Sequence, residues 1–202
     1  MRIIWWLWLL LLCAPGLWAI VAIVVDIGEP GKMLGADAPE TLLLHFGEWG
    51  LRLLLVTLLF PTLRRRVHWQ AALRFRRMTG LSAFVYLSLH FLVYLALLAG
   101  FSLQQIVVDL TERAYITVGF AAWVVLLLLA ATSTRGWQRR LKRGWVRLHR
   151  LVYVAIPLGL LHLLWLTKAG YLEAMVYGLI YAALMIERWP GLLKRRQVPG
   201  GY

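Results

Sequence analysis

Charge is scarce in this sequence, and acidic charge most of all. Of the 202 residues, 15% are charged and only nine are aspartate or glutamate, whereas 61% are hydrophobic. A soluble domain of this length cannot hide so much apolar surface, while a lipid bilayer solvates it. The composition therefore excludes an ordinary soluble protein and predicts a membrane protein.

Cysteine is nearly absent as well. Cys13 is the only one, which excludes an internal disulfide, a CxxC motif and a c-type haem attachment site. The sequence also lacks a linker rich in proline or serine, an internal repeat and a low-complexity tract. We therefore expect a single membrane domain over residues 1–202.

Long apolar runs are what the sequence has instead. A helix needs about 17 to 25 residues to cross a bilayer, and six apolar segments approach or reach that length. They predict an all-α protein, a bundle of six transmembrane helices followed by a tail at 187–202. The approximate helix ranges are 3–25, 41–63, 78–99, 114–133, 148–167 and 171–186.

The distribution of basic residues predicts how the bundle is oriented. A net charge of +13 would suit nucleic acid, but the lysines and arginines lie in clusters between apolar runs. Acidic residues concentrate in the alternate connections, 26–40 and 109–112. Cytoplasmic loops of membrane proteins carry the excess of basic residues, so both termini are expected in the cytoplasm. The clusters that hold 18 of the 22 basic residues are Arg2, Arg64–Arg77, Arg135–Arg150 and Arg188–Arg196.

Two histidines lie deep inside predicted spans. His90 is 12 residues beyond Met78 and His162 is 14 beyond Leu148, so both sit about 18 to 21 Å from the basic side. An ionisable side chain at that depth is costly and usually functional. Two imidazoles at one level on neighbouring helices predict axial ligands of one haem iron. The alternative is that each histidine only bonds a neighbouring helix carbonyl.

A second group lies on the basic side. His149 is about 20 Å below His162 and is a candidate ligand of a second haem, or an interfacial residue beside a basic loop. On a straight helix the two histidines do not share a face, although Pro157 between them permits a kink. Arginine suits bidentate anions, so the arginines before the third helix are candidates for binding haem propionates or a flavin phosphate, with membrane anchoring as the alternative. These arginines are Arg74, Arg76 and Arg77.

A third polar group is predicted near the opposite surface. His45, Glu48 and Arg52 recur on one face of the second helix. They suggest a proton or docking site above the haem, a contact to its propionates, or a polar cluster that caps the bundle.

Four stretches resemble the MsrQ (YedZ) family, within the ferric-reductase-like transmembrane group. They are LGADAPETLLLHFGEWG (34–50), RFRRMTGLSAFVYLSLHFLVY (74–94), RAYITVGFAAWVVLLLLAATST (113–134) and WVRLHRLVYVAIPLGLLHLLW (145–165). The resemblance implies b-type haem, one or two, and also FMN, in a multi-pass protein of the bacterial inner membrane. It implies that His90 and His162 bind the outer haem and His149 the inner one. Larger relatives have a further histidine where this chain has Arg76, so the inner haem would lack that partner.

The resemblance also implies the task. Electrons from quinol or a cytoplasmic flavin reductase would pass to a periplasmic molybdopterin-containing catalytic subunit, and that subunit would reduce methionine sulfoxide. The chain itself would transfer electrons only. Two alternatives stay open: a stand-alone quinol- or metal-reducing cytochrome b, and a small transporter without haem that uses its histidines as proton relays.

Overall fold

The computed structural model describes residues 2–166 and 171–188, and every regular element in this part of the chain is helical. A π-helical turn, Tyr94–Leu98, follows α3, and a single 3₁₀ turn, His149–Leu151, joins α7 to α8. The helices are α1 (Arg2–Gly28), α2 (Ala38–Arg66), α3 (Ala72–Val93), α4 (Leu103–Glu112), α5 (Ala114–Ala131), α6 (Arg135–Leu141), α7 (Arg143–Leu148), α8 (Val152–Leu166) and α9 (Tyr171–Ile186).

Each predicted apolar segment is helical in the described residues except at Ala99, Thr132 and Ser133, and five of the helical stretches are long and apolar enough to cross a membrane. Helix α9 has 16 residues, or about 24 Å, somewhat less than the roughly 30 Å of a hydrocarbon core. The structure therefore shows five candidate spans and one shorter apolar helix. Thr167 and the tail beyond Arg188 lie outside the described residues. The five stretches are Ile3–Gly28, Ala38–Arg66, Ala72–Leu98, Ala114–Ala131 and Arg143–Leu166.

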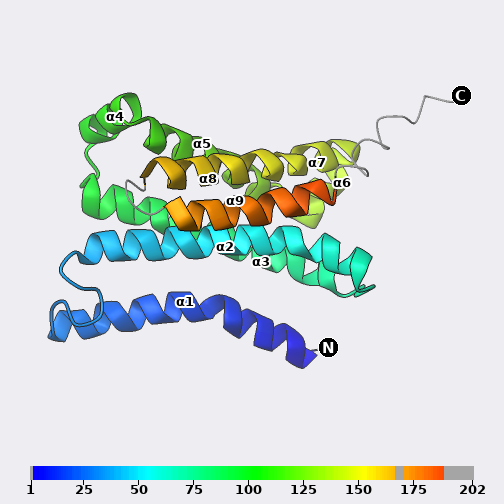
Figure 1. The fold of residues 1–202 in the computed structure, drawn as a ribbon, viewed down its shortest axis with the longest axis horizontal. Coiled ribbons are helices and arrows are strands. Elements are labelled where there is room, and N and C mark those ends of the chain that lie inside the picture. Colours follow the sequence, from blue (N-terminus) through cyan, green and yellow to red (C-terminus); the bar gives the residue numbers. More distant parts are fainter. Residues whose placement is uncertain (1, 167–170, 189–202) are drawn as a thin grey trace, which may run out of the picture.

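Two antiparallel helix pairs form the centre of the bundle (Figure 1). Helix α3 packs mainly on α2, and α8 packs mainly on α5. Contacts of α3 with α5 and of α2 with α8 join the two pairs, and α9 covers α2 and α8. The interior is thus enclosed by four helices that come from two separate parts of the sequence.

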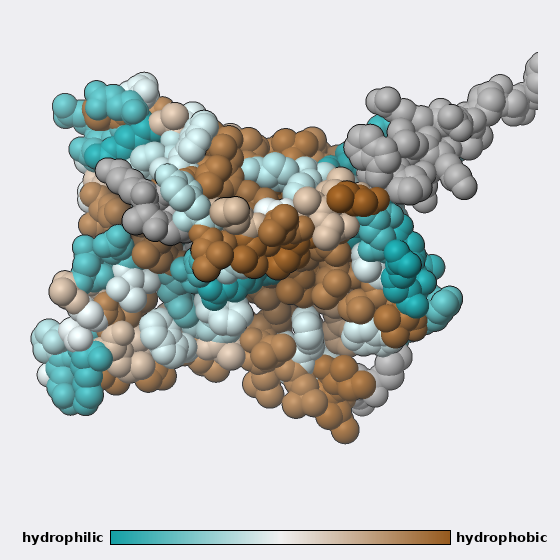
Figure 2. All heavy atoms as spheres, viewed as in Figure 1, coloured by the Kyte–Doolittle hydropathy of each residue, from teal (hydrophilic) through white to brown (hydrophobic). Residues whose placement is uncertain are grey.

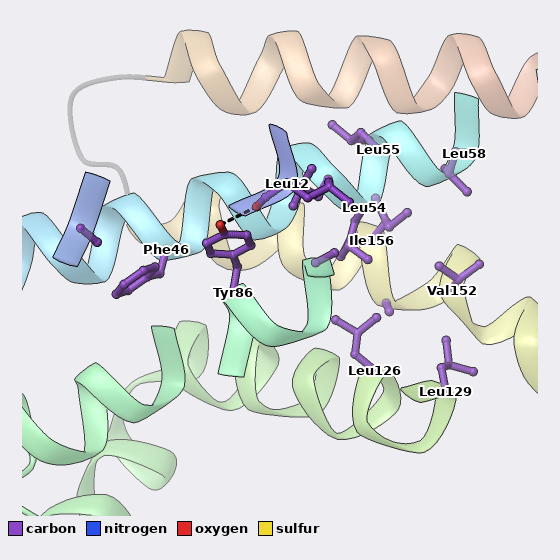
Figure 3. Close-up of a cluster of buried hydrophobic side chains, with 14 of the residues drawn as sticks. Leu12, Phe46, Leu54, Leu55, Leu58, Tyr86, Leu126, Leu129, Val152 and Ile156 are labelled. Carbon is purple, nitrogen blue, oxygen red and sulfur yellow. Dashed lines mark hydrogen bonds between the residues drawn. The ribbon is translucent and has the colours of Figure 1, made fainter. Parts of the chain in front are cut away.

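Leucine and isoleucine side chains fill one half of this interior. Figure 3 shows Leu54 and Leu58 of α2 facing Leu126 of α5 and Ile156 of α8, and Leu58 and Ile156 are completely enclosed. The outer surface is also apolar along the helices, and hydrophilic residues gather at the two ends of the bundle (Figure 2). Such an apolar belt is what a bilayer solvates.

Polar contacts supplement apolar packing where helix α1 lies at the edge of the bundle. Trp8 donates to the Thr79 hydroxyl at 3.0 Å. The Tyr86 hydroxyl donates to the Leu12 carbonyl at 2.7 Å, drawn in Figure 3, and accepts from the Gly16 amide at 2.9 Å. The phenol therefore enters the hydrogen-bond ladder of α1 beside Pro15, a position where a helix is already weakened.

The start of α1, the turn between α2 and α3, helices α6 and α7, and the end of α9 lie at one end of the molecule (Figure 1). We call it the basic end, because the Arg64–Arg77 and Arg135–Arg150 clusters belong to it. The opposite end, which holds the 29–37 connection and α4, is called the acidic end. This separation of charge agrees with the pattern predicted from the sequence.

Candidate functional site

His90 of α3 and His162 of α8 meet inside the bundle. Their ring centres are 6.0 Å apart and their planes are nearly perpendicular, at 86°. The two histidines predicted to lie at one depth therefore lie close together in the structure, although they come from different helix pairs.

Each of these histidines uses one ring nitrogen for a main-chain carbonyl. The Nδ1 atom of His90 lies 2.8 Å from the Leu43 oxygen on α2, and that of His162 lies 2.7 Å from the Tyr115 oxygen on α5. A carbonyl only accepts, so Nδ1 carries the proton and Nε2 keeps its lone pair. This is the hydrogen bond that orients a metal-binding histidine. A histidine that bonds a helix carbonyl through Nδ1 can also bind a metal through Nε2. The two alternatives predicted from the sequence are therefore compatible.

The ring separation suits a metal between them. Imidazole nitrogens bind metals at about 2.0 to 2.1 Å, which puts two ring centres on opposite sides of a metal about 6 Å apart. Haem iron takes its equatorial nitrogens from the porphyrin and needs one ligand on each face. The separation of the two ring centres is therefore compatible with one haem iron between the imidazoles, and neither Nε2 atom has a hydrogen-bond partner among the described residues.

Glycines on the facing helices leave room for both rings. A methyl group at Gly47 of α2 would lie 2.9 Å from the His90 Nδ1, and one at Gly119 of α5 would lie 2.7 Å from the His162 Nδ1. Real Cβ contacts are not that short, so any other residue would displace the ring. The sequence analysis did not identify these two glycines. The available signal was a glycine inside an apolar span one helix away.

The three arginines expected before the third helix lie within the first turns of α3, which begins at Ala72, and together with His149 they line a separate cavity at the basic end. Its volume is about 620 Å³, within the usual range for a small-molecule or cofactor site. Arg74, Arg76, Arg77 and Arg150 line it, and the described lining contains no aspartate or glutamate. The second group predicted from the sequence therefore lines one cavity. Neither His90 nor His162 belongs to the lining of that cavity.

The His149 ring already has partners in this cavity. Its Nε2 lies 3.3 Å from the Thr132 hydroxyl, and Trp145 stacks on the ring at 4.0 Å between centres. The 3₁₀ turn that begins at His149 interrupts the helix well before Pro157, so the phase computed for a straight helix does not apply. Arg76, which occupies the position of the missing second histidine, lines the same cavity. The donor set suits a planar group with anionic substituents better than a metal between two imidazoles.

A further arginine, not predicted, lies beside the cavity. Arg188 follows α9, is 5% exposed, donates through Nη2 to the Leu58 carbonyl and places its guanidinium 5.9 Å above the Tyr153 ring. Its Nη1 has no hydrogen-bond partner among the described residues. Burial lowers the pKa of Arg188 below its ordinary value. Tyr153 lines the cavity, so this cation adds to the positive field there.

The predicted polar group near the acidic end is divided in the structure. Arg52 binds Glu48 at 2.7 Å and the Tyr177 hydroxyl of α9 at 2.7 Å. His45 turns instead to α1, where its Nε2 lies 3.0 Å from the Pro15 carbonyl and its ring stacks on Trp18. These contacts connect α2 with α9 and with α1, as the capping alternative predicts.

A family model described as ferric reductase like transmembrane component matches residues 46–160, more than half of the chain. This range runs from within α2 to a point in α8 two residues before His162, and it identifies the chain as a ferric-reductase-like transmembrane protein.

Curated relatives narrow the class. A protein of Xanthomonas euvesicatoria pv. vesicatoria is 48% identical over 165 residues, which are 81% of this chain and 75% of the relative. A protein of Caulobacter vibrioides is 43% identical over 160 residues, 78% of this chain and 76% of the relative. Both are named protein-methionine-sulfoxide reductase heme-binding subunit MsrQ. The chain belongs to the MsrQ family of ferric-reductase-like transmembrane proteins. No solved structure matches it.

Proposed function

We propose that this chain is the haem b subunit that carries electrons across the bacterial inner membrane to a periplasmic methionine sulfoxide reductase. The observation that carries the proposal is the His90–His162 pair, with ring centres 6.0 Å apart and both Nε2 atoms free for a metal. Membership of a family whose curated members are named haem-binding subunits supports it.

The residues of this site hold, orient and enclose the cofactor. His90 and His162 would hold the haem iron through Nε2, and the hydrogen bonds to the Leu43 and Tyr115 carbonyls would fix the tautomer and direction of the two rings. Haem bound in this way gains and loses one electron at a time. With both faces closed by imidazole, no position is left for a substrate. Reduction of the sulfoxide therefore belongs to the partner, a molybdopterin-containing catalytic subunit.

We propose a second cofactor in the arginine-lined cavity, either FMN or a second haem. Arg74, Arg76 and Arg77 would bind its phosphate or propionates, and the stacked pair His149 and Trp145 would contact its ring. The absence of acidic residues from the described lining supports an anionic occupant.

We also propose that the basic end faces the cytoplasm, with α9 as a sixth span. The arginine clusters at that end support this orientation. The cavity then opens on the side of a cytoplasmic flavin reductase, while the quinol pool is the other proposed donor. The acidic end faces the periplasm, where its charge would set the encounter rate with the partner.

Visible spectroscopy of the purified protein tests the proposal. We expect a reduced b-type spectrum that disappears in His90→Ala and His162→Ala and persists in His68→Ala, a control in the loop between α2 and α3. A folded, colourless preparation would contradict the proposal and favour the transporter alternative.

A second assay distinguishes a subunit of a methionine sulfoxide reductase system from a stand-alone cytochrome b. Reduced protein should be reoxidised by a periplasmic methionine sulfoxide reductase only when methionine sulfoxide is present. If no such enzyme reoxidises it, the stand-alone cytochrome is correct.

A further inference from the structure

The two ligand histidines are held by the same arrangement in two separate helix pairs. His90 bonds a carbonyl 47 residues earlier in the chain, and so does His162. In both pairs the carbonyl belongs to the preceding long helix of the pair, α2 for α3 and α5 for α8. In both pairs a glycine lies four residues after that carbonyl, Gly47 in α2 and Gly119 in α5.

This position of the glycine has a geometric reason. The carbonyl of a helical residue already accepts the amide proton of the residue four positions later. Each Cα–Cβ bond tilts toward the helix N-terminus, so the side chain of that later residue leans over the carbonyl. A ring from another helix can reach the oxygen only if this side chain is missing.

The space beside the two glycines agrees with this geometry. A methyl group on Gly119 would lie 2.7, 3.0 and 3.1 Å from three atoms of the His162 ring, and one on Gly47 would lie 2.9 and 3.1 Å from two atoms of the His90 ring. By contrast, a methyl group at Gly159 of α8 would come no closer than 3.8 Å to Leu51, and one at Gly178 of α9 would meet nothing within 4 Å. The two glycines that face histidine rings therefore leave no space for a side chain, as does Gly50 of α2, where a methyl group would lie 2.5 Å from Leu87, whereas Gly159 and Gly178 do leave that space.

We propose that Gly47 and Gly119 are the positioning residues of the haem centre, and that the α2–α3 and α5–α8 pairs hold their histidines by the same arrangement of carbonyl and glycine. Each glycine exposes a helix carbonyl to the imidazole that it faces, and so fixes the protonated nitrogen and the direction of the ligand nitrogen. The inference rests on the proposed function, because it concerns the same histidines.

These hydrogen bonds to helix carbonyls would affect the equilibrium between ferric and ferrous haem. A hydrogen bond from Nδ1–H to a carbonyl makes the imidazole a stronger electron donor, which favours the oxidised metal. A methyl group at either glycine would push the ring away from the carbonyl and weaken that bond. Both substitutions should therefore favour the reduced state, and in the same direction because the two arrangements are equivalent.

The test compares Gly47→Ala and Gly119→Ala with Gly178→Ala, a matched control in α9. We expect at least a tenfold rise in the ferrous to ferric ratio at a fixed potential, which is about 59 mV for a one-electron couple. The low-spin EPR signal should change in both variants and stay unchanged in the control. Parent potential and parent EPR spectra in both glycine variants would overturn the inference.

A complementary variant covers the case in which the alanine proteins lose haem. In His162→Gly, free imidazole should restore the bis-imidazole spectrum, and adding Gly119→Ala should weaken imidazole binding at least tenfold. Equal imidazole affinity in the two backgrounds would overturn the inference. A parent protein without haem would instead overturn the proposed function, so the two failures are distinct.

Discussion

At the scale of single residues, the Tyr86 hydroxyl shows how a polar atom can organise a membrane helix. It bonds the Leu12 carbonyl and the Gly16 amide of α1, next to Pro15, which cannot donate a backbone hydrogen bond. Lipid offers no replacement partner for these backbone groups.

We therefore expect Tyr86→Phe to destabilise the protein by about 1 to 2 kcal/mol, since two hydrogen bonds are lost with little change in volume. Thermal unfolding in detergent measures this. Tyr171→Phe, at an exposed tyrosine, is the control. The haem spectrum should not change, and equal unfolding temperatures for the two variants would contradict the structural role.

The sequence alone suggested that His90 and His162 lie at one level, and the structure places their rings side by side, but the backbone partners of these rings were not predicted. The depth of His90 and His162 follows from sequence position, because helix rise is constant. The carbonyls of Leu43 and Tyr115 and the glycines beside them depend on how two helices approach each other. No single apolar segment contains that information.

At the scale of elements, the short helix α4 is attached through a buried carboxylate. Asp109 is 3% exposed and accepts from Tyr94 at 2.8 Å and Gln105 at 2.9 Å, with Arg113 at 3.3 Å. Tyr94 begins the π-helical turn after α3, so this contact joins three consecutive elements.

Asp109→Asn should cost about 1 to 3 kcal/mol, because the amide turns an NH₂ group toward at least one of these donors and removes the charge. Glu112→Gln, an exposed change on the same helix, should cost almost nothing. Thermal unfolding compares the two variants, and an Asp109→Asn protein as stable as the control would contradict this account.

The end of α9 is held by an ion cluster that depends on pH. Glu187 contacts Arg65 at 3.5 Å and Arg66 at 3.4 Å. Burial alone would raise the pKa of Glu187, but the favourable contacts, including these two guanidiniums, outweigh it and lower the pKa below its ordinary value. A carboxylate with a lowered pKa stabilises the fold above its ordinary pKa, and this contribution disappears as the pH falls through the folded value.

Glu187→Gln should accordingly lower stability at pH 7 by no more than about 1 kcal/mol, because the partners are largely exposed. The difference from the parent should shrink as the pH falls into the acid range where the carboxylate takes up its proton. Unfolding midpoints measured at several pH values test this, and a difference independent of pH would refute the electrostatic cause.

Element-level prediction was accurate for long helices and poor for short ones. The six apolar segments are recovered because each contains an uninterrupted apolar run. Helices α4 and α6 were read as loops, since their sequences mix polar and apolar residues. The 3₁₀ turn at His149 was expected only as a kink linked to Pro157.

At the scale of the whole molecule, the separation of charge between the two ends predicts the orientation in the membrane. In a Cys13→Ser background, a cysteine in place of Lys32 should react with an impermeant maleimide added to intact spheroplasts. A cysteine in place of Arg139 should react only after lysis. The opposite pattern would reverse the proposed direction of electron transfer.

The contacts of α1 also bear on how the chain is made. The Tyr86 hydroxyl follows its Gly16 partner by 70 residues, so a ribosome adding about 5 to 20 residues per second synthesises Gly16 some 4 to 14 seconds before that phenol exists. During this interval α1 has entered the lipid without the group that completes its hydrogen bonding. The first helix to be synthesised therefore completes its hydrogen bonding only after Tyr86 has been made.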